Sequence, residues 1–137
     1  MLKTHRSRLI YAALLAGFAL LTAVGPSPAQ ETLKPGDVIS GRLRYVQTQH
    51  PNGTPINAFQ IVIGSPRDFA VKDEFCNGTP KTFHLVVMDD KEKAARLARQ
   101  IGKKIFVIGE EFFCSQTAWH IGDAVVTKWR FEEPFAR

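Results

Sequence analysis

The spacing of apolar and polar residues predicts a mainly β protein with one helix. Five segments have the length and composition of strands: residues 37–48, 57–65, 83–88, 104–113 and 124–131. In the first, Ile39, Leu43 and Tyr45 fall on one face and Arg42 and Arg44 on the other, which is typical of a half-buried strand. The near-continuous apolar run of the fourth predicts burial on both of its faces.

Between the third and fourth strands the pattern changes to the period of a helix. Asp89 or Asp90 can cap the start of this helix, and Gly102 can end it. Four apolar residues recur at positions i, i+3, i+4 and i+7 and predict one buried stripe: Ala94, Leu97, Ala98 and Ile101.

The element order β-β-β-α-β-β predicts a five-stranded Greek-key barrel of the oligonucleotide/oligosaccharide-binding (OB) type, with the helix plugging one end. Gly41 interrupts the first strand and would allow it to bend sharply. The alternative is an open α+β sheet with the helix on one face, and only strand pairing distinguishes the two. The barrel domain is expected at residues 37–131, after a polar lead-in at 30–36 and before a tail at 132–137.

The first 29 residues have the three parts of a secretory signal peptide. A basic start at residues 3–8 precedes an apolar run at 9–24, and Ser27 and Ala29 supply the small residues of a cleavage site. The alternative is a membrane anchor, for which the apolar run is slightly short. We therefore expect cleavage after Ala29, a periplasmic or secreted location, and no stable membrane insertion afterwards.

Removal of the leader changes the charge of the protein. The leader holds three of the 18 basic residues and none of the 13 acidic residues, so the remaining 15 basic and 13 acidic residues give a net charge of +2. Nucleic-acid binding requires a basic groove with stacking aromatic residues. The small net charge and the export signal both argue against a nucleic-acid partner.

Two cysteines remain after cleavage, Cys76 and Cys114. In a small exported domain, two cysteines most simply form one disulfide. The pairing requires the long connection at residues 66–82 to fold back along the barrel toward the end of the fourth strand. If it cannot, both thiols are free.

The segment "IGKKIFVIGEEFFCSQTAWHIGDAVV" resembles the closing part of a family of small exported bacterial domains of unknown function. In that family a Gly-Lys-Lys precedes an alternating strand, a His-rich loop and a final apolar strand. Upstream, "GRLRYV" and "AFQIVIGSPRDFAV" resemble its first strand and the end of its second. The resemblance implies an OB-like barrel outside the cytoplasm and no particular activity. Here Trp119 and His120 replace the consecutive histidines of the family loop.

No convincing catalytic set emerges from the sequence. A cysteine nucleophile at Cys114 would need a base and oxyanion donors, and His120 is its only close histidine. Adjacent carboxylates such as Glu110 and Glu111 point to opposite faces of a strand and do not converge. We therefore expect a protein that is not an enzyme and has no cofactor.

A metal site is the second hypothesis. In an OB barrel, the loops that carry His50 and His120 flank one binding face, so these residues and Asp123 could share a metal ion. The chain lacks the short ligand spacings of common zinc sites. His84 alternates with apolar neighbours and is expected at the surface.

The favoured hypothesis is a binding face between the first and last hairpin loops, suited to a sugar, a peptide or a protein partner in the cell envelope. The alternative for Trp119 is a core plug over the barrel mouth, and for Arg42 and Arg44 a simple solvated strand face. The candidate ligand-binding residues are Arg42, Arg44, Tyr45, His50, Gln60, Gln116, Trp119 and His120.

Overall fold

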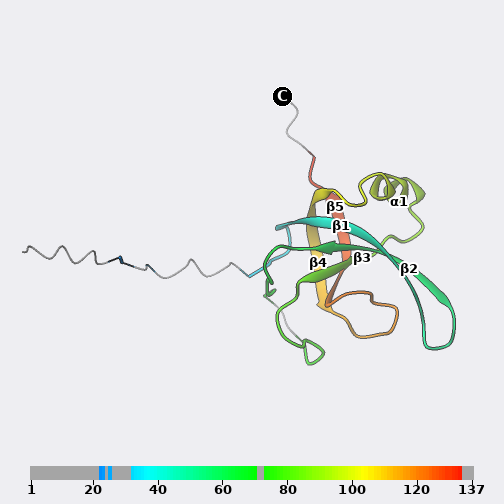
Figure 1. The fold of residues 1–137 in the computed structure, drawn as a ribbon, viewed down its shortest axis with the longest axis horizontal. Helices are drawn as coiled ribbons and strands as arrows, with labels where there is room; N and C mark the ends of the chain where they lie inside the picture. Colours follow the sequence, from blue (N-terminus) through cyan, green and yellow to red (C-terminus); the bar gives the residue numbers. More distant parts are fainter. Residues whose placement is uncertain (1–21, 24, 26–31, 71–72, 134–137) are drawn as a thin grey trace, which may run out of the picture.

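The computed structural model describes residues 22–23, 25, 32–70 and 73–133. Most of the expected signal peptide and the last four residues lie outside the described part. Within that part, no helix is both long and apolar enough to span a membrane. The elements are β1 (Val38–Gln49), β2 (Pro55–Val62), β3 (Thr82–Leu85), α1 (Lys91–Ala98), β4 (Lys104–Cys114) and β5 (Ala124–Phe131) (Figure 1).

The five strands form one closed ring. Their order is β1-β2-β3-β5-β4, and β1 pairs with both β2 and β4, which closes the sheet on itself. All pairs are antiparallel except β3 with β5, which run parallel. The predicted mainly β fold with five strands and one helix is confirmed, and the alternative of an open sheet is wrong.

Gly41 lies where β1 passes from one neighbour to the other. β1 pairs with β4 from Val38 to Arg42 and with β2 from Arg42 onward. A Cβ atom at Gly41 would lie 2.3 Å from the carbonyl oxygen of Val62, far inside van der Waals contact. Only glycine therefore allows β1 and β2 to approach this closely at the crossing point.

The core fills the ring with residues from every element. Of the two residues predicted to cap the helix, Asp90 is the one that does so. Its side chain accepts a hydrogen bond from the Lys93 N–H at 2.8 Å. This places Leu97 of the helix in the core. The principal buried side chains are Ile39, Leu43, Ile61, Phe83, Leu85, Leu97, Val107, Val126 and Trp129.

Two burial predictions are wrong. The helix ends at Ala98, which is exposed, and Ile101 is exposed beyond it, so Leu97 alone of the helix residues is buried. β4 buries one face rather than two, because Ile105 and Val107 point inward while Phe106 between them is exposed. Lys104 lies over the Phe106 ring with its Nζ 5.3 Å from the ring centroid.

The lead-in and the long connection are more ordered than their composition predicts. Leu33, in the lead-in, is buried in the core and forms a β-bridge with Phe69 of the long connection. The Leu33 N–H donates to the Asp68 carbonyl, and the Ala70 N–H donates to the Leu33 carbonyl. The packed part of the described chain thus begins before residue 37.

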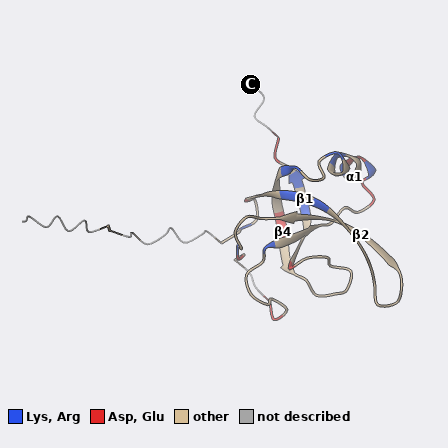
Figure 2. Cartoon of the chain, in the orientation of Figure 1, with Lys and Arg blue, Asp and Glu red and all other residues tan. Residues whose placement is uncertain are grey.

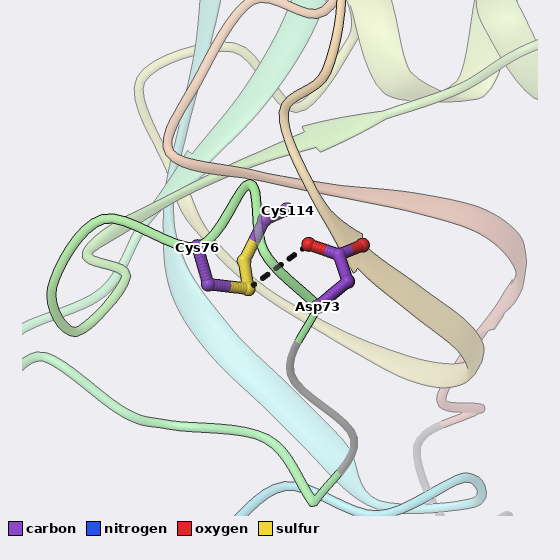
Figure 3. A group of neighbouring side chains, drawn as sticks. All are labelled: Asp73, Cys76 and Cys114. Atoms are coloured by element: carbon purple, nitrogen blue, oxygen red, sulfur yellow. Dashed lines mark hydrogen bonds between the residues drawn. A yellow bond between two sulfur atoms is a disulfide. The ribbon is translucent and has the colours of Figure 1, made fainter.

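Cys76 and Cys114 form the predicted disulfide, with their Cα atoms 5.1 Å apart (Figure 3). The connection after β2 does fold back, and the Arg67 N–H donates to the Pro80 carbonyl across its base. The bridge therefore ties this connection to the last residue of β4, where the loop between β4 and β5 begins. The Gln116 side chain reinforces the tie by donating to the Asp73 carboxylate at 2.8 Å.

Candidate functional site

The β1–β2 hairpin projects beyond the ring (Figure 1). β3 is shorter than predicted and ends at Leu85, which pairs with Phe59. Beyond Phe59, toward the hairpin loop, β2 pairs with β1 alone among the described residues. The far half of the hairpin therefore has one free edge, and this edge forms one side of the candidate site.

The loop between β4 and β5, residues 115–123, lies against the projecting hairpin. His50 of the hairpin loop stacks on Trp119, with ring centroids 4.2 Å apart and planes inclined by 23°. The two loops predicted to flank a binding face thus touch each other. Trp119 is 45% exposed, so the alternative that it plugs the core is wrong.

Hydrogen bonds fix the position of this loop. Gln60 on β2 is 3% exposed and donates through Nε2 to the Ile121 carbonyl at 2.7 Å. The Ile121 N–H in turn donates to Nδ1 of His84 on β3 at 3.1 Å. The Asp123 carboxylate accepts from the N–H groups of Lys81 and Thr82. The loop is therefore anchored to β2 and β3 at several points.

A groove of about 700 Å³ runs between the free edge of β2, the segment after β3 and the tip of the 115–123 loop. Three large apolar side chains on its walls are substantially exposed: Tyr45 at 40%, Met88 at 77% and Trp119 at 45%. Phe59 also lines it, with its ring centroid 5.1 Å from that of Tyr45. Exposed apolar residues gathered in one concavity are typical of a binding site.

The walls of this groove are almost free of charge. The three segments that supply most of them, residues 45–66, 82–88 and 112–122, contain no Lys, Arg, Asp or Glu. Figure 2 shows the consequence, because the projecting end of the hairpin carries neither blue nor red. The charged residues of the lining, Asp89, Asp90 and Lys91, follow one another in sequence just after Met88.

His84 and His120, beside the groove, favour their neutral forms. Burial is the main cause that lowers the pKa of His84 to about 4, and the nearby His120 contributes to the same shift. Burial also lowers the pKa of His120. His84 does face away from the core, as its strand position predicts, but the Ile121 N–H covers it, so the prediction of a surface residue is only partly correct.

The structure divides the predicted ligand-binding residues into two groups. Tyr45, Trp119 and His120 line the groove, and His50 joins its rim through the stack on Trp119. The other four make bonds within the protein. Arg42 donates to the Gly102 carbonyl, Arg44 to the buried Gln60 amide, and Gln116 to Asp73.

The expected metal ligands do not come together. His50 Nδ1 accepts a hydrogen bond from the Asn52 N–H, and His120 Nδ1 accepts one from the Gln116 N–H. The Asp123 carboxylate accepts hydrogen bonds from backbone N–H groups, including that of Lys81. Among the described residues, one group of three potential ligands has its donor atoms within 4.8 Å: Asp73, Cys76 and Cys114 (Figure 3). Its two sulfur atoms form the disulfide and are not thiolates, so it lacks the soft ligands that zinc binds.

The groove residues that sequence reasoning missed include Asn57, Phe59 and Met88. Met88 was assigned to the third strand, but β3 ends before it and leaves it at the surface. The long uncharged stretch at residues 45–66 is the signal that could have identified this side of the molecule.

Comparison with known proteins adds no assignment to this geometry. No protein-family model, curated protein or solved structure matches the chain.

Proposed function

We propose that the protein is an exported, non-catalytic binding module that holds an uncharged ligand in the groove between the β1–β2 and β4–β5 loops. The observation that carries this proposal is the groove itself. It gathers three exposed apolar side chains, Tyr45, Met88 and Trp119, between wall segments without charged residues.

The architecture supports an OB-like barrel as the scaffold. The closed strand order β1-β2-β3-β5-β4, with the helix between β3 and β4, agrees with the five-stranded Greek-key barrel expected from the element order. OB folds bind ligands beside strands 2 and 3 and the loops 1–2 and 4–5. The groove uses the same parts, although arguing from fold to function is an analogy and the side chains carry the proposal.

Export is supported by two independent features. The first 29 residues have the pattern of a signal peptide, and Cys76 and Cys114 form a disulfide, a bond that persists in oxidising compartments. A periplasmic or secreted location follows from the proposal. The ligand is then a component of the cell envelope or its surroundings.

The chemistry of the walls selects among ligand classes. Aromatic faces suit the apolar faces of sugars and the side chains of peptides. A nucleic acid needs cations along its backbone, and neither Arg42 nor Arg44 lines the groove. The proposed ligand is therefore a neutral sugar, an uncharged peptide segment or an apolar patch of a protein partner.

Tryptophan fluorescence provides the test. The described chain has one exposed tryptophan, Trp119 at 45%, and one buried tryptophan, Trp129 at 5%. We would titrate the mature protein with two probes, N,N′,N″-triacetylchitotriose and a pool of uncharged octapeptides, and follow the emission. A ligand in the groove shifts the Trp119 emission and leaves Trp129 unchanged.

Phe106 supplies the matched control for Trp119. It is 44% exposed and lies in a separate concavity among charged residues, including Arg96, Lys104 and Glu133. Binding followed by calorimetry should weaken at least tenfold in Trp119→Ala and stay within twofold in Phe106→Ala. Equal losses in the two variants, or a loss in Phe106→Ala alone, would contradict the proposal.

A further inference from the structure

The free edge of β2 has a defined hydrogen-bonding pattern. In an antiparallel ladder, alternate residues direct both their N–H and C=O groups toward the same neighbouring strand. The Ile63 N–H donates to the Lys81 carbonyl, on the β3 side. Odd-numbered residues of this strand therefore face β3, and Phe59, opposite Leu85, is the last of them to be paired.

Two residues earlier, Asn57 also directs its backbone N–H and C=O toward that side. The even-numbered residues face β1, in agreement with the bond from the His50 N–H to the Thr54 carbonyl that closes the hairpin. Among the described residues, Asn57 pairs with Gln47 of β1 and has no ladder partner on the β3 side. Its donor and acceptor thus point into the groove.

The chain after β3 leaves room at this edge. The Val86 N–H donates to the Val126 carbonyl at 3.0 Å, so the segment continues along β5 while the hairpin extends away from it. The groove opens between them, lined on one side by Asn57 and on the other by Val87 and Met88. This is the position that a longer β3 would have occupied.

We propose that the ligand of the groove is an extended, uncharged polypeptide segment, which adds to β2 as a short strand and bonds to the backbone of Asn57. This inference rests on the proposed function and specifies its ligand. A peptide backbone supplies N–H and C=O groups at the spacing that a strand edge requires, which a sugar does not. Alternate side chains of the guest would face Tyr45 and Phe59, which share one face of the hairpin.

The charge distribution favours this partner. The three uncharged wall segments accept apolar or small polar side chains, because a charged side chain placed against them would lose its hydration without gaining a partner there, and the charges of the lining are confined to Asp89, Asp90 and Lys91. Pro55, the first residue of β2, has no N–H and limits further pairing along the edge. The guest strand is therefore short, and its apolar contacts with Met88 and Trp119 contribute much of the affinity.

The test compares two substitutions at one position. Asn57→Pro removes a backbone N–H that β1 does not use, whereas Asn57→Ala keeps that N–H and removes only the side chain. The probe is a pool of blocked synthetic octapeptides built from Gly, Ser, Thr, Asn, Val, Leu and Phe. Peptides retained on immobilised mature protein are identified by mass spectrometry, and their Kd values are measured by calorimetry.

We expect Asn57→Ala to bind within twofold of the native protein and Asn57→Pro to bind about tenfold more weakly, because one bond is lost and the proline ring blocks the edge. Circular dichroism and urea unfolding should show that both variants fold. A retained peptide that carries an N-methyl group on alternate backbone nitrogens should lose affinity in one register of methylation and keep it in the other.

The remaining outcomes of these experiments would overturn either the strand-addition inference alone or the proposed function as well. Equal affinity of the two Asn57 variants, with affinity lost in Trp119→Ala, would overturn strand addition and leave the groove as the binding site. Binding of triacetylchitotriose without retention of any peptide would also overturn strand addition and leave the groove as the binding site. A Trp119 shift with neutral phosphatidylcholine vesicles and none with peptides would assign the surface to lipid and overturn the inference. No response to any probe would count against both proposals.

Discussion

Replacing Gln60 by alanine tests whether this buried amide holds the 115–123 loop in place. Gln60 is the one buried polar side chain among the described residues, and both ends of its amide are bonded. Its Oε1 accepts from Arg44 Nε, and its Nε2 donates to the Ile121 carbonyl at 2.7 Å. The substitution removes both bonds and leaves the Ile121 carbonyl without this donor.

The expected cost follows from these two bonds. A hydrogen bond contributes about 0.5–1.5 kcal/mol net, and a buried group that loses its partner costs about 1–3 kcal/mol. We therefore expect Gln60→Ala to lower the free energy of unfolding by about 2–3 kcal/mol. With a urea dependence of about 1.5 kcal/mol per molar for a domain of this size, the unfolding midpoint falls by roughly 1.5–2 M.

Gln47→Ala is the matched control, because Gln47 lies on the same hairpin and is exposed. Its effect should stay within about 0.5 kcal/mol. Acrylamide quenching supplies a second measurement, since release of the loop would expose Trp119 further in Gln60→Ala. A difference between the two variants smaller than about 1 kcal/mol, with unchanged quenching, would refute the assignment of Gln60 as the anchor of the loop.

Three further predictions concern the scaffold. Replacing Cys76 and Cys114 together by alanine should cost about 3–4 kcal/mol, from the entropy of the loop they close, and reductant should then no longer lower the urea midpoint; a persistent effect of reductant would contradict this. Gly41→Ala should cost about 3 kcal/mol because its Cβ would strike backbone, whereas Gly64→Ala, with nothing within 4 Å, should be tolerated, and thermal melts of the two variants check the difference. Because the pKa of His84 is lower in the folded protein than in the unfolded chain, the unfolded chain takes up this proton at a higher pH. The contribution of His84 to the free energy of unfolding is therefore fully present above pH 6.5 and is lost as the pH falls toward 4. In urea titrations between pH 6.5 and 4, His84→Asn should lose less stability than the native protein. Equal losses in the two proteins would exclude His84 as the cause of the pH dependence.

The sequence predicts the scaffold well because its signals are local. Alternating or continuous runs of apolar residues located all five strands, the change to a helical period located α1, and the only possible cysteine pair is the one that forms. The extent of burial was harder to predict, since Phe106 and Ile101 belong to apolar patterns but face solvent. Whether an apolar residue is covered depends on which elements pack over it, which short-range pattern does not encode.

The candidate site was predicted in part, for a related reason. The sequence identified Tyr45, Trp119 and His120 because the first strand and the last hairpin loop border one binding face in an OB-type arrangement. It did not reveal that Gln60 and Arg44 bond to each other. Nor did it reveal the free edge at Asn57, because that edge exists only where β3 ends before its neighbour does. Strand length is set by tertiary pairing, and the apolar residues at 86–88 extend the local pattern beyond it.

The most direct test of the account is a map of ¹⁵N chemical-shift changes in the mature protein on addition of its tightest-binding probe from the panel. The account predicts that the largest changes cluster on the backbone of Asn57, Met88 and Trp119, which lie on the three uncharged wall segments of the groove. Changes centred on Phe106 and Arg96, in the charged concavity beside the helix, or spread over the surface without a cluster, would contradict it.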